Sequence, residues 1–519
     1  MQAHKIGLTD THSFSSFFLD YITQKESLKP FYHRFPSLEN FRSQREDRAA
    51  FSPATRRILS ESLRHQYQGV KTSSKTEAHL NSLANEKTFT VTTGHQLNIF
   101  TGPLYFIYKI VTVINACKIL KEKYPDYNFV PVYWMATEDH DYDEIKYFRL
   151  YGKKYTWETN QTGAVGRFDP KSIVKLIDII PGDTSLFQTA YSKSTTLANA
   201  TRYFVNELFG HEGLVIVDAD DPALKSLLRP VIHQDLFENQ TKLLVEEKNQ
   251  ALEKLGYHPQ VFAREINFFY LDKNIRQRIE KKDGRFVVID STLSFSAEDM
   301  ESMIEQSPEK FSPNVILRPL YQEIILPNLA YVGGPAEVVY WLQLKGVFDS
   351  FSTPFPLLMP RNFASVMDEP TKKKFDKTGL ELKDLFEEKN YLFNHWISKN
   401  SSAHLSLGKE IREAEAIFKR VKENASQIDP TLHQHAEAKT TQMIEALQVI
   451  ERKMLRAEKR KHTEKLKQIE AIKDTLFPNG NPQERTDNFL NFFQADPDFI
   501  QKLIAQFDPL DFRFTILTP

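Results

Sequence analysis

Two neighbouring segments of this 519-residue chain constrain its fold most strongly. In the first, the strand-like run KTFTVTT leads into Gly94 and then into a helix expected to begin near Pro103. In the second, residues 128–137 form a strand pattern, and six ionisable side chains follow it: Glu138, Asp139, His140, Asp141, Asp143 and Glu144. A strand, a loop and a helix N-terminus in this order build an anion site in α/β proteins. The two segments therefore predict a nucleotide- or metal-assisted enzyme of the α/β class.

The periodicity of the first segment supports this interpretation. Residues 89–92 alternate apolar and threonine side chains, which is the period of a pleated strand. From Leu104 to Ile114, apolar residues recur at three- and four-residue steps, so one face of the helix is predicted to be buried. Thr101 is expected to cap this helix, and Pro103 stands where a missing N–H costs least.

Composition excludes several classes of protein. The formal net charge is −1, so no global basic field attracts nucleic acid or an anionic membrane. No run of about eighteen apolar residues is present, and the first residues lack the apolar core of a signal peptide. Cys117 is the only cysteine, which rules out internal disulfides and a zinc site that needs two thiolates. We expect a cytoplasmic protein without zinc, nucleic-acid or membrane partners.

The chain is too long for one ordinary core, and its patterns predict three parts. Residues 1–380 are expected to form an α/β core with insertions, and 477–519 to dock back onto that core. The intervening residues 381–476 are expected to form a helical hairpin. The predicted core strands are residues 89–93, 128–137, 213–220, 285–290 and 315–320.

The helical hairpin is predicted from two heptad seams. Apolar residues alternate steps of three and four from Leu407 to Ile428 and again from Met443 to Ala457. Asp429 and Pro430 interrupt the helix between the two seams. Two such helices form a long antiparallel hairpin, which is expected to pair with its copy in a homodimer. The basic stretch 452–467 has two interpretations: a site for RNA or phosphate, or the solvated face of the coiled coil. The glutamates interspersed in it favour the solvated face.

No glycine-rich phosphate motif is present, so an anion site must come from a helix terminus and side chains. Tyr105, Tyr108 and Lys109 meet that description, with a buried core helix as the alternative. The residues from Glu138 to Asp141 would place base, amine-binding and Mg²⁺-binding groups at a strand end. A solvated acidic turn is the alternative.

A third segment, residues 312–341, places polar side chains within an apolar run: Asn314, Arg318, Gln322 and Glu323. Buried polar groups cost free energy unless they are paired or used. Ligand contact and structural pairing of Arg318 with Glu323 both remain open.

Taken together, the motifs resemble those of the bacillithiol biosynthesis cysteine-adding enzymes, a family of cysteine ligases. The motifs are TGHQ with TGPLYFIYK, WMATEDHDYDEI, SPNVILRPLYQE, YVGGPAEVVYW, MPRNF and LFPNGNPQER, which together span residues 93–485. The resemblance implies a Rossmann-like core with connecting-peptide insertions, similar to class I aminoacyl-tRNA synthetases, and a dimerising coiled coil. It also implies a reaction that joins cysteine to the amino group of glucosaminyl malate.

Site residues follow from this resemblance. Tyr105 and Tyr108 match the two histidines of the synthetase motif HIGH, and Arg361 in MPRNFAS is the cation of a KMSKS-like segment. The implied nucleotide site, for ATP with Mg²⁺, comprises Thr101, Gly102, Tyr105, Tyr108, Lys109 and Arg361. The implied substrate site comprises Gly94, His95, Gln96, Asn314, Arg318, Gln322 and Glu323, with Arg318 suited to a malate carboxylate.

In this scheme Asp139, His140 or Asp141 holds or deprotonates the attacking amine, as catalysis at neutral pH requires. The alternative is a non-catalytic, synthetase-like scaffolding dimer. The missing histidines and lysines of the two synthetase motifs favour that alternative, and the dense carboxylates oppose it.

Overall fold

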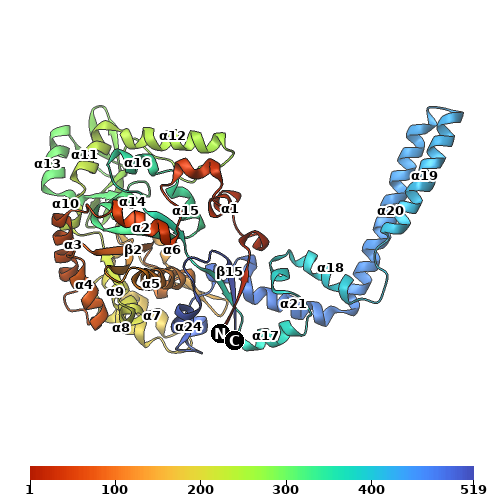
Figure 1. The fold of residues 1–519 in the computed structure, drawn as a ribbon, viewed down its shortest axis with the longest axis horizontal. Helices are drawn as coiled ribbons and strands as arrows, with labels where there is room; N and C mark the ends of the chain where they lie inside the picture. Colours follow the sequence, from red (N-terminus) through yellow and green to blue (C-terminus); the bar gives the residue numbers. More distant parts are fainter. The chain divides into compact units, whose positions relative to one another are not determined.

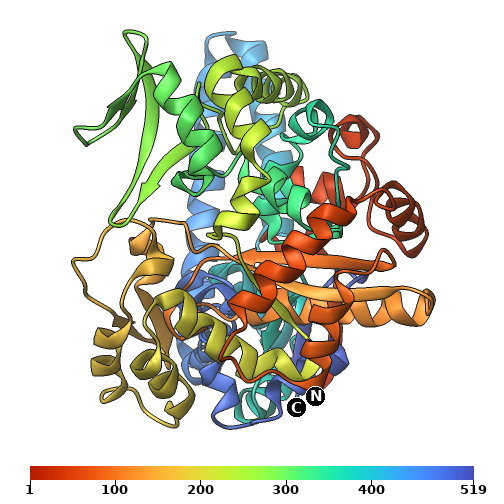
Figure 2. The same ribbon diagram turned by 90° about the vertical axis from the view of Figure 1, so that its left-hand side faces the viewer.

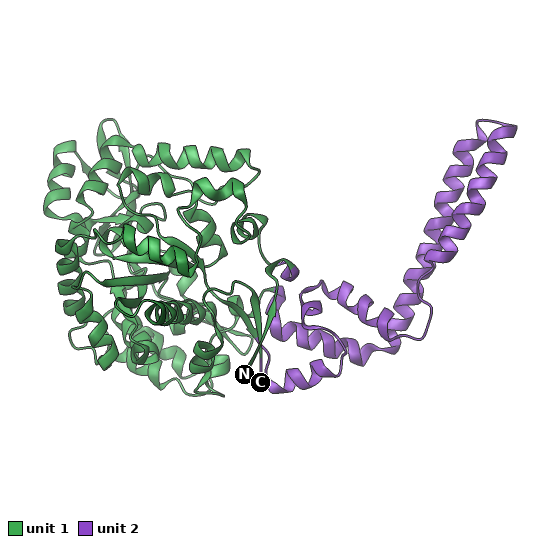
Figure 3. Ribbon diagram, viewed as in Figure 1, with its two compact units in different colours: residues 1–9, 13–365, 481–517 green, residues 10–12, 366–480, 518–519 purple.

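The computed structural model describes residues 1–519, which form two compact units (Figure 3). Unit 1 comprises residues 1–9, 13–365 and 481–517, and unit 2 comprises residues 10–12, 366–480 and 518–519. The chain thus leaves unit 1 after Ser365 and returns to it at Asn481. This division falls earlier in the chain than the boundary at residue 381 expected from the sequence.

A five-stranded parallel sheet lies at the centre of unit 1 (Figure 1). The strand order is β13 (Leu357–Pro360), β12 (Asn328–Gly333), β2 (Thr88–His95), β3 (Asn128–Met135) and β6 (Val215–Asp218). The strands are buried along almost their whole length, as is typical of parallel strands covered on both faces. The register pairs Gly94 with Trp134 and His95 with Met135, so β2 and β3 end side by side.

Helix α5 (Tyr105–Lys123) packs along β2 and β3 and is buried over most of its length. Its inner face joins a core cluster with Val91, Phe129 and Val332, and Cys117 lies within that cluster. The expectation that Thr101 caps this helix is wrong. Leu104 precedes its first turn without a capping side chain, and Thr101 lies in a left-handed turn with φ of 70°.

Two predicted core strands are also wrong. Residues 285–290 contribute β9 (Arg285–Val288) to a separate antiparallel sheet, which Figure 2 shows as green strands at one side of unit 1. The order of that sheet is β10 (Ser294–Phe295), β9, β8 (Ile275–Lys282), β7 (Phe268–Asp272) and β11 (Phe311–Pro313). Residues 315–320 lead into helix α14 (Arg318–Ile325) instead of forming a strand. The Asn314 side chain accepts hydrogen bonds from the N–H groups of Ile316 and Leu317 and turns the chain there.

The remaining elements of unit 1 surround these sheets. The N-terminal segment carries β1 (Gln2–Ile6), α1 (Ser16–Ile22), α2 (Leu38–Asp47), α3 (Pro53–Gln66) and α4 (Ser74–Ser82). Between β3 and β6 lie α6 (Tyr142–Ile145), β4 (Tyr147–Leu150), β5 (Lys153–Thr156), α7 (Val174–Ile177), α8 (Ser185–Lys193) and α9 (Leu197–Phe209). Later helices are α10 (Pro222–Ser226), α11 (Arg229–Glu238), α12 (Gln240–Lys254), α13 (Ala297–Gln306), α15 (Pro335–Trp341) and α16 (Lys345–Ser350).

The C-terminal segment completes unit 1. It contains α22 (Gln483–Thr486), α23 (Leu490–Phe493), α24 (Phe499–Gln506) and β15 (Phe514–Thr518). β15 is the middle strand of a small sheet, between β1 and β14 (Phe363–Val366). Asn115 on α5 donates hydrogen bonds to the carbonyl oxygens of Ile504 and Phe507, which joins this segment to the core.

Unit 2 is helical. It comprises α17 (Glu369–Asp376), α18 (Lys389–Asn400), α19 (Gly408–Ile428), α20 (Leu432–Lys461) and α21 (Thr463–Leu476). α19 and α20 pack together as a hairpin that turns at Asp429–Pro430. No helix of the structure has both the length and the apolar character needed to span a membrane.

Candidate active site

A cavity of about 680 Å³ opens where β2, β3 and β12 end. Parallel strands all present their carboxyl ends at one edge of the sheet, which is where ligands bind in this class of fold. The strand ends and following loops contribute Gly94, His95, Gln96, Trp134, Met135, Ala136, Thr137, Glu138, Asp139 and Tyr331. Other parts of unit 1 contribute Tyr105, Lys109, Phe262, Arg264, Phe269, Arg276, Pro313, Asn314, Val315, Arg318, Gly334, Pro335, Ala336, Glu337, Tyr340, Arg361 and Arg485.

Arg318 brings an unneutralised cation into this cavity. It is the first residue of α14, and Pro319 after it favours the start of a helix. The guanidinium carbon lies 5.9 Å from the Trp134 ring centre and 5.5 Å from that of Tyr331. Nη1 donates to the Gln322 side chain at 3.3 Å, whereas the buried Nη2 has no hydrogen-bond partner. The carboxylates of the cavity form their ion pairs with other cations, Glu337 with Lys109, Glu138 with Lys225 and Asp139 with Arg276. Arg318 is therefore available to an anionic ligand.

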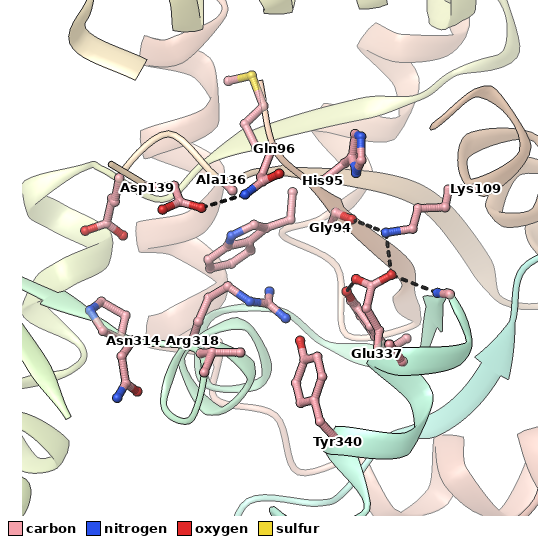
Figure 4. Close-up of a pocket in the computed structure, with 18 of the residues that line it drawn as sticks. Gly94, His95, Gln96, Lys109, Ala136, Asp139, Asn314, Arg318, Glu337 and Tyr340 are labelled. Carbon is pink, nitrogen blue, oxygen red and sulfur yellow. Dashed lines mark hydrogen bonds and ion pairs between the residues drawn. The ribbon is translucent and has the colours of Figure 1, made fainter. Parts of the chain in front are cut away.

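Lys109, by contrast, is fully engaged (Figure 4). Its Nζ donates to the Gly94 carbonyl oxygen at 2.9 Å and pairs with Glu337 at 2.5 Å. Glu337 also accepts hydrogen bonds from the Tyr331 hydroxyl and the Gly334 N–H, at 2.6 and 2.7 Å. Burial alone would raise the pKa of Glu337, but Lys109 and Tyr331 lower it to about 2. This network holds the ends of β2 and β12 together rather than offering a free cation.

Arg361 is neutralised in the same way. Its Nη1 and Nη2 donate to the two carboxylate oxygens of Glu484 at 2.9 and 2.6 Å, and both side chains are nearly completely buried. The guanidinium carbon lies 5.2 Å from the Tyr105 ring centre and 4.7 Å from that of Phe363. Only Nε is left without a partner. The pair joins the turn between β13 and β14 to the returning C-terminal segment.

Asp139, like Glu337, is a carboxylate of the cavity that is held ionised. Gln96 Nε2 donates to it at 3.0 Å and the His140 N–H at 2.7 Å, while Arg276 Nη1 lies 3.8 Å away. Burial by itself would raise the pKa of Asp139, but the hydrogen bonds from His140 and Gln96 and the charge of Arg276 hold it well below its usual range. Such a carboxylate binds a cation more readily than it removes a proton.

The structure brings together most, but not all, of the predicted site residues. Nine of them line the cavity: Gly94, His95, Gln96, Tyr105, Lys109, Asp139, Asn314, Arg318 and Arg361. Seven do not: Thr101, Gly102, Tyr108, His140, Asp141, Gln322 and Glu323.

Most of these seven residues have partners outside the cavity or face solvent, whereas Thr101 is buried with its hydroxyl unpartnered and Gln322 accepts from Arg318. Asn488 donates a hydrogen bond to the Gly102 carbonyl oxygen, and the buried Tyr108 ring packs on Phe507. His140 Nδ1 contacts Arg276 at 2.6 Å, and Asp141 is exposed. The structural partner of Glu323 is Arg48 at 2.6 Å, rather than Arg318.

His95 lines the cavity as a neutral ring. Its centre lies 5.4 Å from that of Tyr105 and 5.1 Å from that of Phe106, and the enclosed Nε2 has no partner. Burial lowers the pKa of His95 to about 3, with the charge of Lys109 acting in the same direction. At neutral pH this ring is an uncharged hydrogen-bonding group.

Residues missed from the sequence are chiefly partners of those predicted. Glu337 and Glu484 neutralise Lys109 and Arg361, and Arg276 approaches Asp139. For Glu337 a signal exists, because Gly334-Pro335 followed by an acid at the third helical position is a capping pattern. The other two lie too far away in sequence for any local pattern to indicate them.

A buried network supports the cavity wall at Asn314. Asp235, which is completely buried, accepts hydrogen bonds from the Asn267 N–H at 2.5 Å and from its Nδ2 at 3.0 Å. Asn267 Oδ1 in turn accepts from Asn314 Nδ2 and the Arg264 N–H, both at 3.0 Å. Burial raises the pKa of Asp235 to about 6, although the bonds from Asn267 oppose that shift.

Because the folded-state pKa of Asp235 exceeds its unfolded value near 4, folding favours the protonated carboxyl group. The stability it contributes is present below about pH 4 and is lost as the pH rises through about 6. Relative to Asp235→Asn, which cannot titrate, we expect the wild type to lose on the order of 3 kcal/mol of unfolding free energy between pH 4 and 8. Denaturant titrations of both proteins across this range measure the difference; a constant difference would contradict the raised pKa.

Comparisons with known proteins agree with this architecture. The family model described as "Bacillithiol biosynthesis BshC, N-terminal Rossmann-like domain" matches residues 1–362, and "Bacillithiol biosynthesis BshC, C-terminal coiled-coil domain" matches residues 364–519. The fold prediction of a Rossmann-like parallel α/β core with a helical coiled coil is confirmed.

Curated relatives match over nearly the full chain. A protein of Cytophaga hutchinsonii named "Putative cysteine ligase BshC" is 41% identical over 98% of this chain and 97% of its own. Proteins of the same name from Flavobacterium johnsoniae and Bacillus licheniformis are 41% and 28% identical, covering 97% and 94% of each chain. A solved "putative arginyl t-RNA synthetase" from Campylobacter jejuni aligns at 10% identity with a TM-score of 0.20, over 84% of this chain and 96% of its own. The two domain models and the full-length relatives show that the chain belongs to the BshC family of bacillithiol biosynthesis.

Proposed function

We propose that this protein is a cysteine ligase that joins the carboxyl carbon of cysteine to the amino group of glucosaminyl malate, completing bacillithiol. One observation carries the proposal: the same cavity presents a half-buried cation without an anionic partner, Arg318, and a carboxylate kept ionised, Asp139. Glucosaminyl malate carries carboxylates and a primary ammonium group, which are the complements of these two residues. The names of the relatives supply cysteine as the second substrate.

The recognition scheme assigns a chemical role to each wall of the cavity. The Arg318 guanidinium binds a malate carboxylate, and its planar fork suits two parallel hydrogen bonds. Asn314, held by Asn267, adds an amide group beside it. Asp139, oriented by Gln96, receives the ammonium group of the sugar. The neutral His95 completes the polar wall without competing for either charge.

ATP with Mg²⁺, the expected activator of cysteine, fits this set of residues poorly. Of the six residues expected to bind nucleotide, only Tyr105, Lys109 and Arg361 line the cavity. Both of these cations already have carboxylate partners, so neither is free to balance a triphosphate. The donor substrate of the proposed reaction is therefore a cysteine whose carboxyl group already carries a leaving group.

The proposal predicts that Asp139→Asn weakens the affinity for glucosaminyl malate by about 10- to 100-fold, because a charge-assisted hydrogen bond contributes roughly 1.5–3 kcal/mol. Asp141→Asn removes the same charge two residues away, on an exposed side chain, and is the matched control with unchanged affinity. Calorimetry measures the affinities, and mass spectrometry detects the condensation product. Equal affinities of the two variants for glucosaminyl malate would show that Asp139 does not bind this substrate. A wild-type protein that forms no product would favour the scaffolding alternative.

We also propose that the protein is a homodimer through the α19–α20 hairpin. No residue of α19 is buried, and several large apolar side chains of the hairpin are about half exposed, Ile417 and Val421 at 50% and 49% and Ile450 at 48%. Apolar stripes of this kind mark interaction surfaces on soluble proteins. Two packed helices alone leave the stripe uncovered, and a second copy of the hairpin is the partner that matches it.

The double variant Ile417→Lys/Val421→Lys places two charges on one stripe of α19, since residues four apart share a helix face. We expect it to be a folded monomer by light scattering, whereas the wild type is a dimer. Glu415→Gln/Glu423→Gln changes the net charge by the same amount on exposed positions and should remain a dimer. A dimeric Lys variant would place the interface elsewhere.

A further inference from the structure

Glu138 lines the cavity together with the carboxylates of Asp139 and Glu337, and the scheme above leaves it without a role. Its side chain is 11% exposed, and it forms an ion pair with Lys225, whose side chain is completely buried. Lys225 does not line the cavity, and its Nζ also donates to the Phe311 carbonyl oxygen at 2.6 Å. The cation thus lies behind the carboxylate. Lys225 is the sole hydrogen-bond donor to Glu138, so the remaining lone pairs are available to a ligand.

The other basic groups of the cavity are poor proton acceptors at neutral pH. Lys109 and Tyr331 lower the pKa of Glu337 to about 2, and burial lowers that of His95 to about 3. The pKa of Asp139 also lies below its usual range. Burial raises the pKa of Glu138, and the charge of Lys225 opposes that rise only in part. Among the carboxylates that line the cavity, Glu138 is the strongest base.

We propose that Glu138 is the proton acceptor for the attacking amine, while its neighbour Asp139 binds that amine as an ammonium ion. This inference rests on the proposed ligase function and names the catalytic base of that site. Two adjacent carboxylates at the end of one strand then have different roles: Asp139 binds the ammonium group, and Glu138 removes a proton from it. An amine must lose a proton before it can attack, since the ammonium form has no free electron pair.

The ammonium nitrogen gives one proton to a Glu138 carboxylate oxygen, and its freed electron pair attacks the carboxyl carbon of the activated cysteine. The new C–N bond forms as the bond from that carbon to the leaving group breaks, and the leaving group departs with its electron pair. The second ammonium proton is lost from nitrogen to water, and the proton on Glu138 returns to solvent through the cavity mouth. Before it takes up the proton, the Glu138 carboxylate has its negative charge balanced by the buried Lys225.

Several charged or titratable groups besides Lys225 face Glu138 and influence its titration. They are Asp220, which follows β6; Arg276 on β8; Arg167, which precedes α7; and Tyr321 on α14. The wild-type rate should fall at low pH as Glu138 becomes protonated. The midpoint of this acidic limb of the pH–rate profile should lie above pH 4.3, the approximate pKa of an ordinary glutamate. Removal of the Glu138 carboxylate should abolish that limb.

The experiment compares wild type, Glu138→Gln and Asp139→Asn with glucosaminyl malate and a cysteine thioester as the activated donor. Glu138→Gln should lower kcat by about 10²- to 10⁴-fold and remove the acidic limb, with the affinity for glucosaminyl malate within about threefold of wild type. Asp139→Asn should instead weaken that affinity. The two variants therefore separate proton transfer from binding.

Because Glu138→Gln leaves Lys225 buried without its partner, the double variant Glu138→Gln/Lys225→Met provides a folded control. We expect it to melt near the wild-type temperature and to remain inactive. A folded double variant with kcat within about threefold of wild type would overturn Glu138 as the base, as would a Glu138→Gln variant whose defect lies entirely in affinity. A wild-type protein that binds glucosaminyl malate but makes no product from any activated cysteine would instead overturn the ligase function itself.

Discussion

Replacing Arg361 with methionine is expected to lower the free energy of unfolding by about 3–5 kcal/mol, the range found when one partner of a buried ion pair is removed. Its partner Glu484 is 3% exposed. The Glu484 carboxylate accepts hydrogen bonds from Nη1 and Nη2 of Arg361, and another from the Ala364 N–H at 3.1 Å. Without Arg361, that carboxylate would remain buried and uncompensated. Chemical denaturation followed by tryptophan fluorescence measures the change.

Two controls identify the cause of this destabilisation. Arg42→Met breaks an exposed pair with Glu46, at 70% and 57% exposure, and should cost less than about 1 kcal/mol. The double variant Arg361→Met/Glu484→Leu removes both buried charges and should recover most of the lost stability. If Arg361→Met proves as mild as Arg42→Met, the pair does not join the C-terminal segment to the core in the way that we infer.

Arg318→Met is expected to weaken the binding of glucosaminyl malate by about 2–5 kcal/mol, or roughly 30- to several thousandfold, the usual cost of truncating a buried charged contact. The same substitution should not destabilise the unliganded protein, because Arg318 forms no ion pair there and its Nη2 is unsatisfied. Loss of affinity without loss of melting temperature therefore distinguishes a ligand-binding cation from a structural one.

Calorimetric titration and thermal melting of Arg318→Met measure the two quantities. Arg264→Met is the matched control: it removes an exposed guanidinium from the same cavity wall, and its effect on affinity should be under about tenfold. Unchanged affinity in Arg318→Met, or a loss shared equally by both variants, would mean that the malate carboxylates bind elsewhere.

The parallel core could be predicted where the local pattern determines the outcome. β2 alternates apolar residues with threonine, β3 and β6 are short apolar runs, and all three are strands in the predicted positions. The run at 315–320 is equally apolar, but periodicity cannot separate a short buried strand from a helix start. There the Asn314 side chain turns the chain, and Pro319 in the first turn favours the start of a helix.

The prediction that residues 285–290 join the parallel sheet is wrong, although the sequence holds a local signal for the antiparallel one. Asp283-Gly284 is a preferred two-residue hairpin turn, which pairs β8 with β9 antiparallel rather than sending the chain into a crossover. The sequence does not predict β12 and β13, because they lie within longer apolar stretches without the alternation that marks a half-buried strand.

For the cavity, the residue types at the strand ends predict which side chains line it, but the sequence does not predict which of its charged side chains are already paired. Gln96 and Asp139 are both expected in the substrate crevice, and the pairing of β2 with β3 places them within hydrogen-bond distance. Whether Lys109 or Arg361 is a free cation depends on Glu337 and Glu484, which only the folded chain brings near them. Hence the sequence predicts where the site lies better than which of its charges remain available.

The return of the chain to unit 1 at Asn481 has a consequence for biosynthesis. A nascent chain that ends at Ser365 has made the whole parallel sheet, but it lacks Glu484 and the strand β15 that lies between β1 and β14. Translation of the 115 residues 366–480 takes on the order of 10 s at ordinary rates. During that interval Arg361 is without its partner and two strand edges are open, a state that favours contact with chaperones. Premature stop codons after the sheet would therefore produce an aggregation-prone fragment rather than a smaller working enzyme.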